Sequence, residues 1–180
     1  MSRCVAFEGA DLTGKTSLIA ALQRRMPYSM WPLLSIHSSK EALREPGGAA
    51  VNAAGVAFYS AVAAMARTMP VILDRCYVTN YVYGRVFGRE PDFDVITGVA
   101  ARLRPRVIYV YTPLEVLLER LKWRGDDFVD RKTLVMIYDG YVAWCGANPF
   151  DDEIVRVDST VASDLDALAE MVAGQLETAS

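Results

Sequence analysis

The residues best suited to chemistry begin at position 9, where eight residues read GADLTGKT. They complete the pattern G-x-x-x-x-G-K-S/T, in which backbone N–H groups and the N-terminus of a following helix surround a phosphate. Lys15 would reach the terminal phosphates, and the Thr16 hydroxyl would face Mg²⁺. We expect Lys15 to supply charge without packing against other groups. The predicted ATP site comprises Gly9, Ala10, Asp11, Leu12, Thr13, Gly14, Lys15, Thr16 and Ser17.

A second polar pair follows an apolar segment in the middle of the chain. Asp74 and Arg75 come directly after residues 71–73, which read VIL and predict a strand. The carboxyl ends of parallel strands form the edge at which open α/β sheets bind ligands. We therefore expect Asp74, with Thr16, to hold Mg²⁺. If the protein transfers a phosphoryl group, Arg75 would clamp that group or the acceptor molecule that receives it.

A parallel sheet is needed to bring these residues together, and the chain has the alternation that builds one. Short apolar runs typical of strands buried on both faces alternate with helical patterns. Strands are expected at residues 4–7, 33–37, 71–73, 107–111 and 154–157. Helices are expected at residues 15–26, 50–68, 77–87, 93–103, 114–124, 130–144 and 161–176. The prediction is an α/β fold, with a five-stranded parallel sheet flanked by helices in a single domain over residues 1–180.

Composition excludes several classes of protein. Apolar residues make up 52% of the 180 residues and charged residues 23%, which is ordinary for a folded domain and excludes a disordered chain. The net charge of −3 lacks the basic excess of an electrostatically driven DNA binder. Three widely spaced cysteines fit neither a disulfide framework nor a zinc site. Without a signal sequence or an apolar run of roughly 18 residues, we expect a cytoplasmic protein that does not enter the membrane.

Three segments resemble thymidylate kinases. FEGADLTGKTS is similar to the opening of that family, VILDRCYVTNYVYG to its Asp-Arg segment, and YTPLEVLLERLKWRG to its strand, proline-started helix and arginine-bearing lid. The resemblance covers most of the chain in the right order. It implies a P-loop kinase fold, a short lid near residues 124–131, and an acceptor pocket opposite the triphosphate.

The lid segment is expected to supply cations to the reaction. Phosphoryl transfer spreads negative charge over the equatorial oxygens, which needs positive groups that arrive as water leaves. Arg124 is the first candidate, Arg120 the second and Arg131 the third. Leu12 stands where some thymidylate kinases carry an arginine in the P-loop, so the lid has to provide this charge. The alternative for Arg120 is the solvated face of an amphipathic helix.

Residues 43–48, which read LREPGG, leave two chemistries open. In thymidylate kinases the arginine that matches Arg44 holds the acceptor monophosphate. In deoxynucleoside kinases a similar Glu-Pro supplies a general base, the role that Glu45 would take here. A phosphate acceptor is already ionised, whereas a hydroxyl acceptor has to lose a proton to a carboxylate. Asp74 and Glu8 are the other candidates for that base.

The remaining acceptor residues follow from position and resemblance. The aspartate that matches Asp11 bonds the acceptor sugar in the resembling family, although an ordinary turn would also explain it. His37, the single histidine, ends an expected strand at the same edge. Tyr83 is a candidate for the acceptor pocket, but Gly84 stands where the family has a base-side glutamine. Aromatic residues in helices more often belong to the core, and this applies to Phe58, Tyr59, Tyr81 and Tyr83.

These patterns leave three functions open. The first is transfer of the γ-phosphoryl group of ATP to a deoxynucleoside monophosphate, as the resemblance implies. The second is phosphorylation of a hydroxyl, on a deoxynucleoside or on a modified base in DNA such as 5-hydroxymethyluracil. The third is a nucleotide-binding module without turnover. The segment Val157-Asp158-Ser159 resembles the loop that holds the donor's adenine, and the oligomeric state, including a homodimer, stays open.

Overall fold

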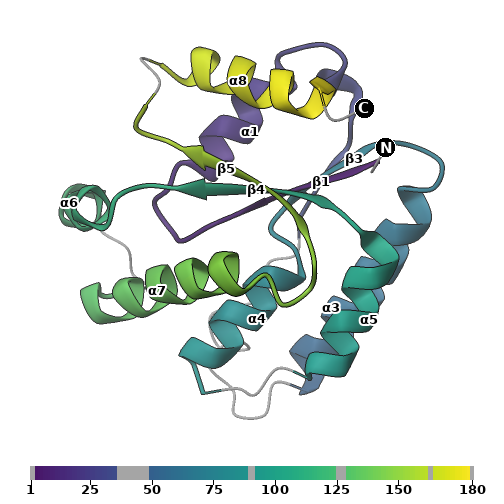
Figure 1. The fold of residues 1–180 in the computed structure, drawn as a ribbon, viewed down its shortest axis with the longest axis horizontal. Coiled ribbons are helices and arrows are strands. Elements are labelled where there is room, and N and C mark those ends of the chain that lie inside the picture. Colours follow the sequence, from purple (N-terminus) through teal and green to yellow (C-terminus); the bar gives the residue numbers. More distant parts are fainter. Residues whose placement is uncertain (1–2, 36–48, 89–91, 125–128, 162–163, 179–180) are drawn as a thin grey trace.

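A computed structural model describes residues 3–35, 49–88, 92–124, 129–161 and 164–178. Its centre is a five-stranded sheet in the order β2-β3-β1-β4-β5, in which every neighbouring pair is parallel (Figure 1). The strands are β1 (Cys4–Glu8), β2 (Leu33–Ser35), β3 (Val71–Asp74), β4 (Arg106–Tyr111) and β5 (Glu153–Asp158). The predicted five-stranded parallel α/β fold is confirmed.

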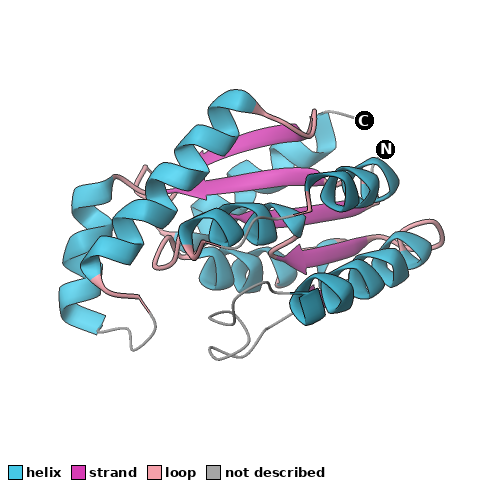
Figure 2. Ribbon diagram, turned by 90° about the horizontal axis from the view of Figure 1, so that it is seen from below, coloured by secondary structure: helices cyan, strands magenta, loops and turns pink. Residues whose placement is uncertain are grey.

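Helices cover both faces of the sheet (Figures 1 and 2). One face carries α1 (Lys15–Gln23) and α8 (Leu165–Thr178). The other carries α3 (Ala49–Met65), α4 (Tyr77–Val86), α5 (Phe93–Leu103) and α7 (Arg131–Ala147), while α6 (Leu114–Arg124) follows β4 and the short η1 (Tyr28–Met30) precedes β2. Among the described residues, none of the helices is long and apolar enough to cross a bilayer.

The two faces of β1 explain why the strand is apolar throughout. All five of its residues are buried. Cys4 and Ala6 belong to the core beneath α4, α5 and α7, whereas Val5 and Phe7 belong to the core beneath α1 and α8. A central parallel strand covered on both faces needs a continuous apolar run rather than an alternating one. This strand is therefore rigidly held where it ends, at the start of the phosphate loop.

Several element ends differ from those predicted. Helix α1 ends at Gln23 and not at residue 26, because the Arg24 and Arg25 N–H groups donate to Ala21 O and Leu22 O, three residues back, in a tightened last turn. Helix α8 begins at Leu165 rather than at residue 161, after the Asp164 side chain accepts a hydrogen bond from the Ala167 N–H at 2.7 Å. Helix α7 extends to Ala147 and stops at Asn148, which is left-handed with φ 42°. The predicted end of the second strand, residues 36–37, lies outside the described residues.

Candidate active site

The phosphate loop joins β1 to α1 at the carboxyl edge of the sheet. Gly9 has φ 143°, and a Cβ at that position would collide with the carbonyl oxygen of Val110 on the neighbouring β4. Gly14 has φ 88° and precedes the first helical residue, Lys15. Both positions therefore require glycine, one for its close approach to β4 and both for their backbone angles.

The side chain of Lys15 lies inside this loop. It is 6% exposed, and its Nζ donates to the carbonyl oxygens of Gly9 at 2.9 Å and Ala10 at 2.6 Å. The expectation that Lys15 packs against nothing is wrong, because the loop closes around its ammonium group. Burial, with the nearby Arg75 charge, lowers the pKa of Lys15 to about 7. A triphosphate in the loop would favour the charged form and raise that pKa again.

Asp11 points from the loop toward the other half of the site. Its Oδ1 accepts from Arg75 Nη2 at 2.6 Å, and its Oδ2 accepts from the Tyr83 hydroxyl at 2.6 Å. Arg75 comes from the end of β3 and Tyr83 from α4, so three elements meet at this carboxylate. A carboxylate in a phosphate loop would be repelled by the phosphates, and here it is held toward β3 and α4 instead.

Arg75 is held on several sides. Its Nη1 donates to Gly9 O at 3.2 Å, to Thr79 Oγ1 at 3.2 Å and to the Tyr141 hydroxyl at 3.1 Å. The backbone at Arg75 has φ 72°, an unusual conformation that directs the strand end toward the loop. Burial works against its charge, but Tyr83, Tyr141 and the carboxylates of Asp11 and Glu8 raise the pKa of Arg75 well above its usual value. Arg75 is therefore a fixed cation.

Glu8, at the end of β1, is completely buried beneath this network. Its Oε1 accepts from the backbone N–H groups of Cys76 at 2.6 Å and Thr79 at 3.2 Å. Its Oε2 accepts from the hydroxyls of Thr79 and Tyr141, each at 2.7 Å. Four donors hold this carboxylate in place, so it anchors the start of α4 and is unsuited to accept a proton from a substrate.

Asp74 and Thr16 keep their polar groups open. Asp74 is half-buried, and among the described residues its carboxylate receives no hydrogen bond and forms no ion pair. Thr16 is exposed in the first turn of α1. Asp74 pairs in register with Phe7, two residues before the loop begins. Oxygen groups of this kind suit Mg²⁺, which keeps several waters and binds through few protein ligands.

Arg120 contacts the phosphate loop from α6. Its Nη1 donates to Leu12 O at 2.8 Å, so this cation lies against the loop rather than on a solvated helix face. Arg131 begins α7 and is exposed. The predicted residues His37, Arg44 and Glu45 lie outside the described residues, as do the side chain of Arg124 and residues 125–128 of the expected lid.

The aromatic residues expected near the acceptor mostly belong to the core. Tyr59 and Tyr83 are buried, and Tyr59 meets Tyr77 edge-on with ring centroids 6.4 Å apart. Phe58 and Tyr81 are partly buried against the same core. Burial raises the pKa of Tyr83 well above its usual value, so its hydroxyl keeps the proton that it donates to Asp11.

Sequence reasoning does not single out Thr79 or Tyr141, although both hold Glu8 and Arg75. Thr79 had a signal, since it occupies the serine position of the Asp-Arg segment that resembles thymidylate kinases. Tyr141 had none, because it lies in α7, 133 residues from Glu8. Its partners can be recognised only once the helix is packed against the sheet.

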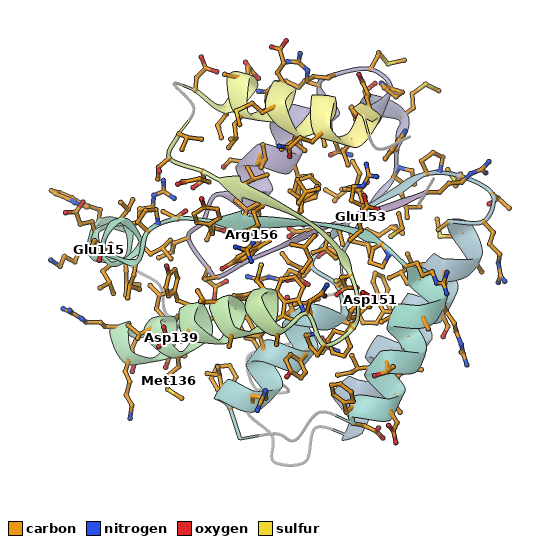
Figure 3. All side chains as sticks on the ribbon, in the orientation of Figure 1. Glu115, Met136, Asp139, Asp151, Glu153 and Arg156 are labelled. Carbon is orange, nitrogen blue, oxygen red and sulfur yellow. The ribbon has the colours of Figure 1, made fainter. Side chains whose placement is uncertain are left out.

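Of the cavities lined by described residues, two lie at opposite edges of the sheet. One of about 400 Å³ lies beside the phosphate loop, between α6 and α8. A larger one, of about 880 Å³, lies at the amino ends of the strands and is lined by residues of α3, α5 and the segment before β5. In Figure 3, Asp151 lies in that segment and Glu153 begins β5. The larger cavity is remote from the phosphate loop. The smaller cavity borders the loop and therefore belongs to the candidate active site.

Comparison with known proteins finds relatives and structural neighbours at low identity. No family model matches the chain. An uncharacterised SPbeta prophage-derived protein of Bacillus subtilis strain 168, YorR, is 24% identical over 144 residues, which is 76% of this chain and 78% of YorR. The crystal structure of YorR in complex with phosphorylated GDP has a TM-score of 0.76 and 20% identity, covering 98% of this chain and 96% of YorR.

Deoxyadenosine kinase from M. mycoides is a further structural neighbour. Its structure with bound dATP has a TM-score of 0.70 and 15% identity, covering 97% of this chain and 99% of the kinase. Its structure with the products dCMP and dCDP has a TM-score of 0.63. At these identities the comparison shows that the chain shares the fold of YorR and of the deoxyadenosine kinase.

Proposed function

We propose that the protein is a P-loop kinase that transfers the γ-phosphoryl group of ATP to a hydroxyl of a deoxynucleoside. The orientation of Asp11 supports an acceptor that carries a sugar. Its two oxygens are bonded to Arg75 and Tyr83, so the carboxylate lies between the phosphate loop and α4, where a sugar hydroxyl would be recognised. The structural likeness to a deoxyadenosine kinase agrees with a nucleoside acceptor.

In this reaction the acceptor oxygen attacks the γ-phosphorus. A new O–P bond forms, the bond between the γ-phosphorus and its bridging oxygen breaks, and ADP leaves. The hydroxyl proton has to pass to a carboxylate. Because four donors hold Glu8, and Asp11 is paired with Arg75 and Tyr83, the remaining candidates are Glu45 and Asp74.

The charged residues around the loop would stabilise the charge that develops on the transferred group. Lys15 and Arg120 lie in or against the loop, and Arg124 follows Arg120 by one turn of α6. Thr16 and Asp74 would hold Mg²⁺, which would neutralise part of the negative charge of the bound phosphates. Arg75 and Tyr83 position Asp11, and Arg75 also presents its charge to the acceptor.

A deoxynucleoside monophosphate is the second candidate acceptor, as in thymidylate kinases. The sequence LREPGG at residues 43–48 favours it, because the arginine matching Arg44 holds a monophosphate in that family. This acceptor needs a cation and no base. The two functions therefore assign different importance to neighbouring residues.

A transfer assay with radiolabelled ATP tests the proposal. The acceptors would be deoxynucleosides, their monophosphates, and DNA that contains 5-hydroxymethyluracil, followed by two variants on the best acceptor. With a hydroxyl acceptor, Glu45→Gln should lower kcat strongly while Arg44→Ala has little effect. With a monophosphate acceptor, Arg44→Ala should raise KM strongly and Glu45→Gln should matter little. Transfer to none of these acceptors would contradict the proposed function.

A further inference from the structure

The cavity of about 400 Å³ beside the phosphate loop is bordered by an exposed tryptophan. Its lining includes Leu12, Thr13 and Gly14 of the loop, Ser17 of α1, Arg120 and Trp123 of α6, and Ser159 after β5. The strand order places this cavity on the β4 and β5 side of the loop, whereas Arg75 and Asp11 meet on the β3 side. The cavity therefore lies on the side away from the proposed acceptor.

Trp123 is held at the mouth of this cavity by its helix. It is 89% exposed, the highest value among the large exposed hydrophobic side chains of the described residues. Arg120, three residues earlier, lies on the same face of α6 and is bonded to Leu12 O at 2.8 Å. Because Arg120 joins α6 to the loop, the indole is kept at the edge of the cavity, beside the loop.

The polar groups around the cavity are largely committed to other partners. Thr13 Oγ1 donates to Ala10 O at 3.0 Å, and Arg120 donates to Leu12 O. The Ser159 hydroxyl bonds the Thr112 hydroxyl at 2.6 Å, and its backbone N–H donates to Tyr111 O at 2.9 Å. Among the described residues that line the cavity, these three side chains are already bonded, whereas the face of the indole is available.

We propose that Trp123 is the stacking platform for the base of the donor nucleotide, and that the cavity holds a purine by its ring face rather than by its edge. This inference rests on the proposed function, since it requires a nucleoside triphosphate in the loop. Stacking on an aromatic side chain accepts any base with a π-face. The donor site should therefore accept ATP and GTP almost equally.

Isothermal titration calorimetry tests the inference with ATP, GTP and inorganic tripolyphosphate, each with Mg²⁺. The proteins are the wild type, Trp123→Ala, Trp123→Phe and the control Met136→Ala, which removes an exposed side chain from α7 (Figure 3). Trp123→Ala should weaken ATP and GTP binding about tenfold or more. Trp123→Phe should restore most of that loss, and tripolyphosphate and Met136→Ala should show no change. The wild-type affinities for ATP and GTP should agree within about tenfold.

Other results would overturn the inference. Unchanged ATP binding in Trp123→Ala, an equal loss of tripolyphosphate binding, or a larger preference between ATP and GTP would each contradict it. Tryptophan fluorescence gives an independent measurement, because Trp144 is buried and Trp31 packs on Tyr28 with ring centroids 5.0 Å apart. ATP should quench the wild-type emission, and tripolyphosphate should not. If the wild type binds neither ligand, the proposed function fails, and the inference fails with it.

Discussion

The two halves of the candidate site are built in different ways. The phosphate-binding part of the donor half is one continuous segment, residues 9–17, formed by a single loop and the first turn of a helix. The half on the acceptor side joins Glu8 of β1, Arg75 after β3, Thr79 and Tyr83 of α4, and Tyr141 of α7. One half depends on local backbone geometry, and the other depends on packing between distant elements.

This difference has a consequence for ligand binding. On the donor side, Thr16 and Ser17 are exposed, and Lys15 is bonded to backbone carbonyls that a triphosphate would replace. On the acceptor side, the charges of Arg75 and Asp11 already satisfy each other at 2.6 Å. The donor half thus has groups that await a partner, whereas the acceptor half is preorganised and rigid.

The largest effect is expected when the donor half loses its cation. Lys15→Met keeps an apolar stem of similar length and removes the charge, so phosphoryl transfer should fall by about 10³-fold. The midpoint of thermal unfolding should stay equal or rise, because a buried ammonium group no longer has to be desolvated. Activity would be measured beside a thermal melt, with the exposed Lys132→Met as the matched control. More than a tenth of wild-type activity would contradict the assignment of the loop.

A smaller effect, on stability, is expected in the acceptor half. Glu8→Gln keeps one acceptor oxygen and replaces the other by an NH₂ group among the four donors. The free energy of unfolding should fall by about 2 kcal/mol, since a buried donor is left poorly satisfied. Urea denaturation measures this change, and Glu115→Gln on the exposed side of α6 (Figure 3) is the control. Equal stability of the two variants would show that the network contributes no rigidity.

The same contrast decides what could be predicted from the sequence. The parallel sheet could be predicted because its buried strands are short apolar runs. The phosphate loop could be predicted because its backbone needs glycine at Gly9 and Gly14. For Asp11 and Arg75, the sequence predicted only that both lie at the same edge of the sheet; it did not predict that they form an ion pair. The role of Tyr141 could not be predicted, since nothing in α7 marks a tyrosine that will meet a carboxylate 133 residues away. The burial of Lys15 was missed because it depends on how the loop folds over its own side chain.

The next largest effect is expected in the pH dependence of ATP binding, because Lys15 titrates in the donor half. Because the pKa of Lys15 is lowered to about 7, the ammonium group of the free protein loses a proton as pH rises above 7. Lys15 has to take up this proton again when phosphates bind, since the charged form interacts with them. ATP affinity should therefore fall with rising pH above about 7, by at most about tenfold per pH unit. Over the window between 7 and the ordinary value of 10.5, the unfolded chain binds more protons, so this group makes stability rise with pH.

Calorimetry in buffers of different ionisation enthalpy measures the affinity and the proton uptake together. The Lys15→Met variant carries no proton at this position, so its affinity for ATP should lack this slope. The ionisation of ATP itself is common to both proteins and cancels in the comparison. Parallel slopes in the two proteins would show that Lys15 is charged throughout this range.

The smallest effect is expected from one hydroxyl of the acceptor half. Tyr141→Phe removes a donor to Glu8 at 2.7 Å and an acceptor for Arg75 at 3.1 Å, while the ring stays packed against Tyr109 and Trp144. Glu8 keeps three donors, and Arg75 keeps its bonds to Gly9, Thr79 and Asp11. The free energy of unfolding should therefore fall by only about 1 kcal/mol. The acceptor KM should rise about threefold, the size of a small loss in binding energy, and the affinity for ATP should not change. Tyr138→Phe, one turn earlier on the same helix and only partly buried, is the matched control for steady-state kinetics with both substrates varied. If Tyr141→Phe changes ATP affinity as much as acceptor KM, the two halves are coupled through α7, and the donor loop depends on the packing of distant elements after all.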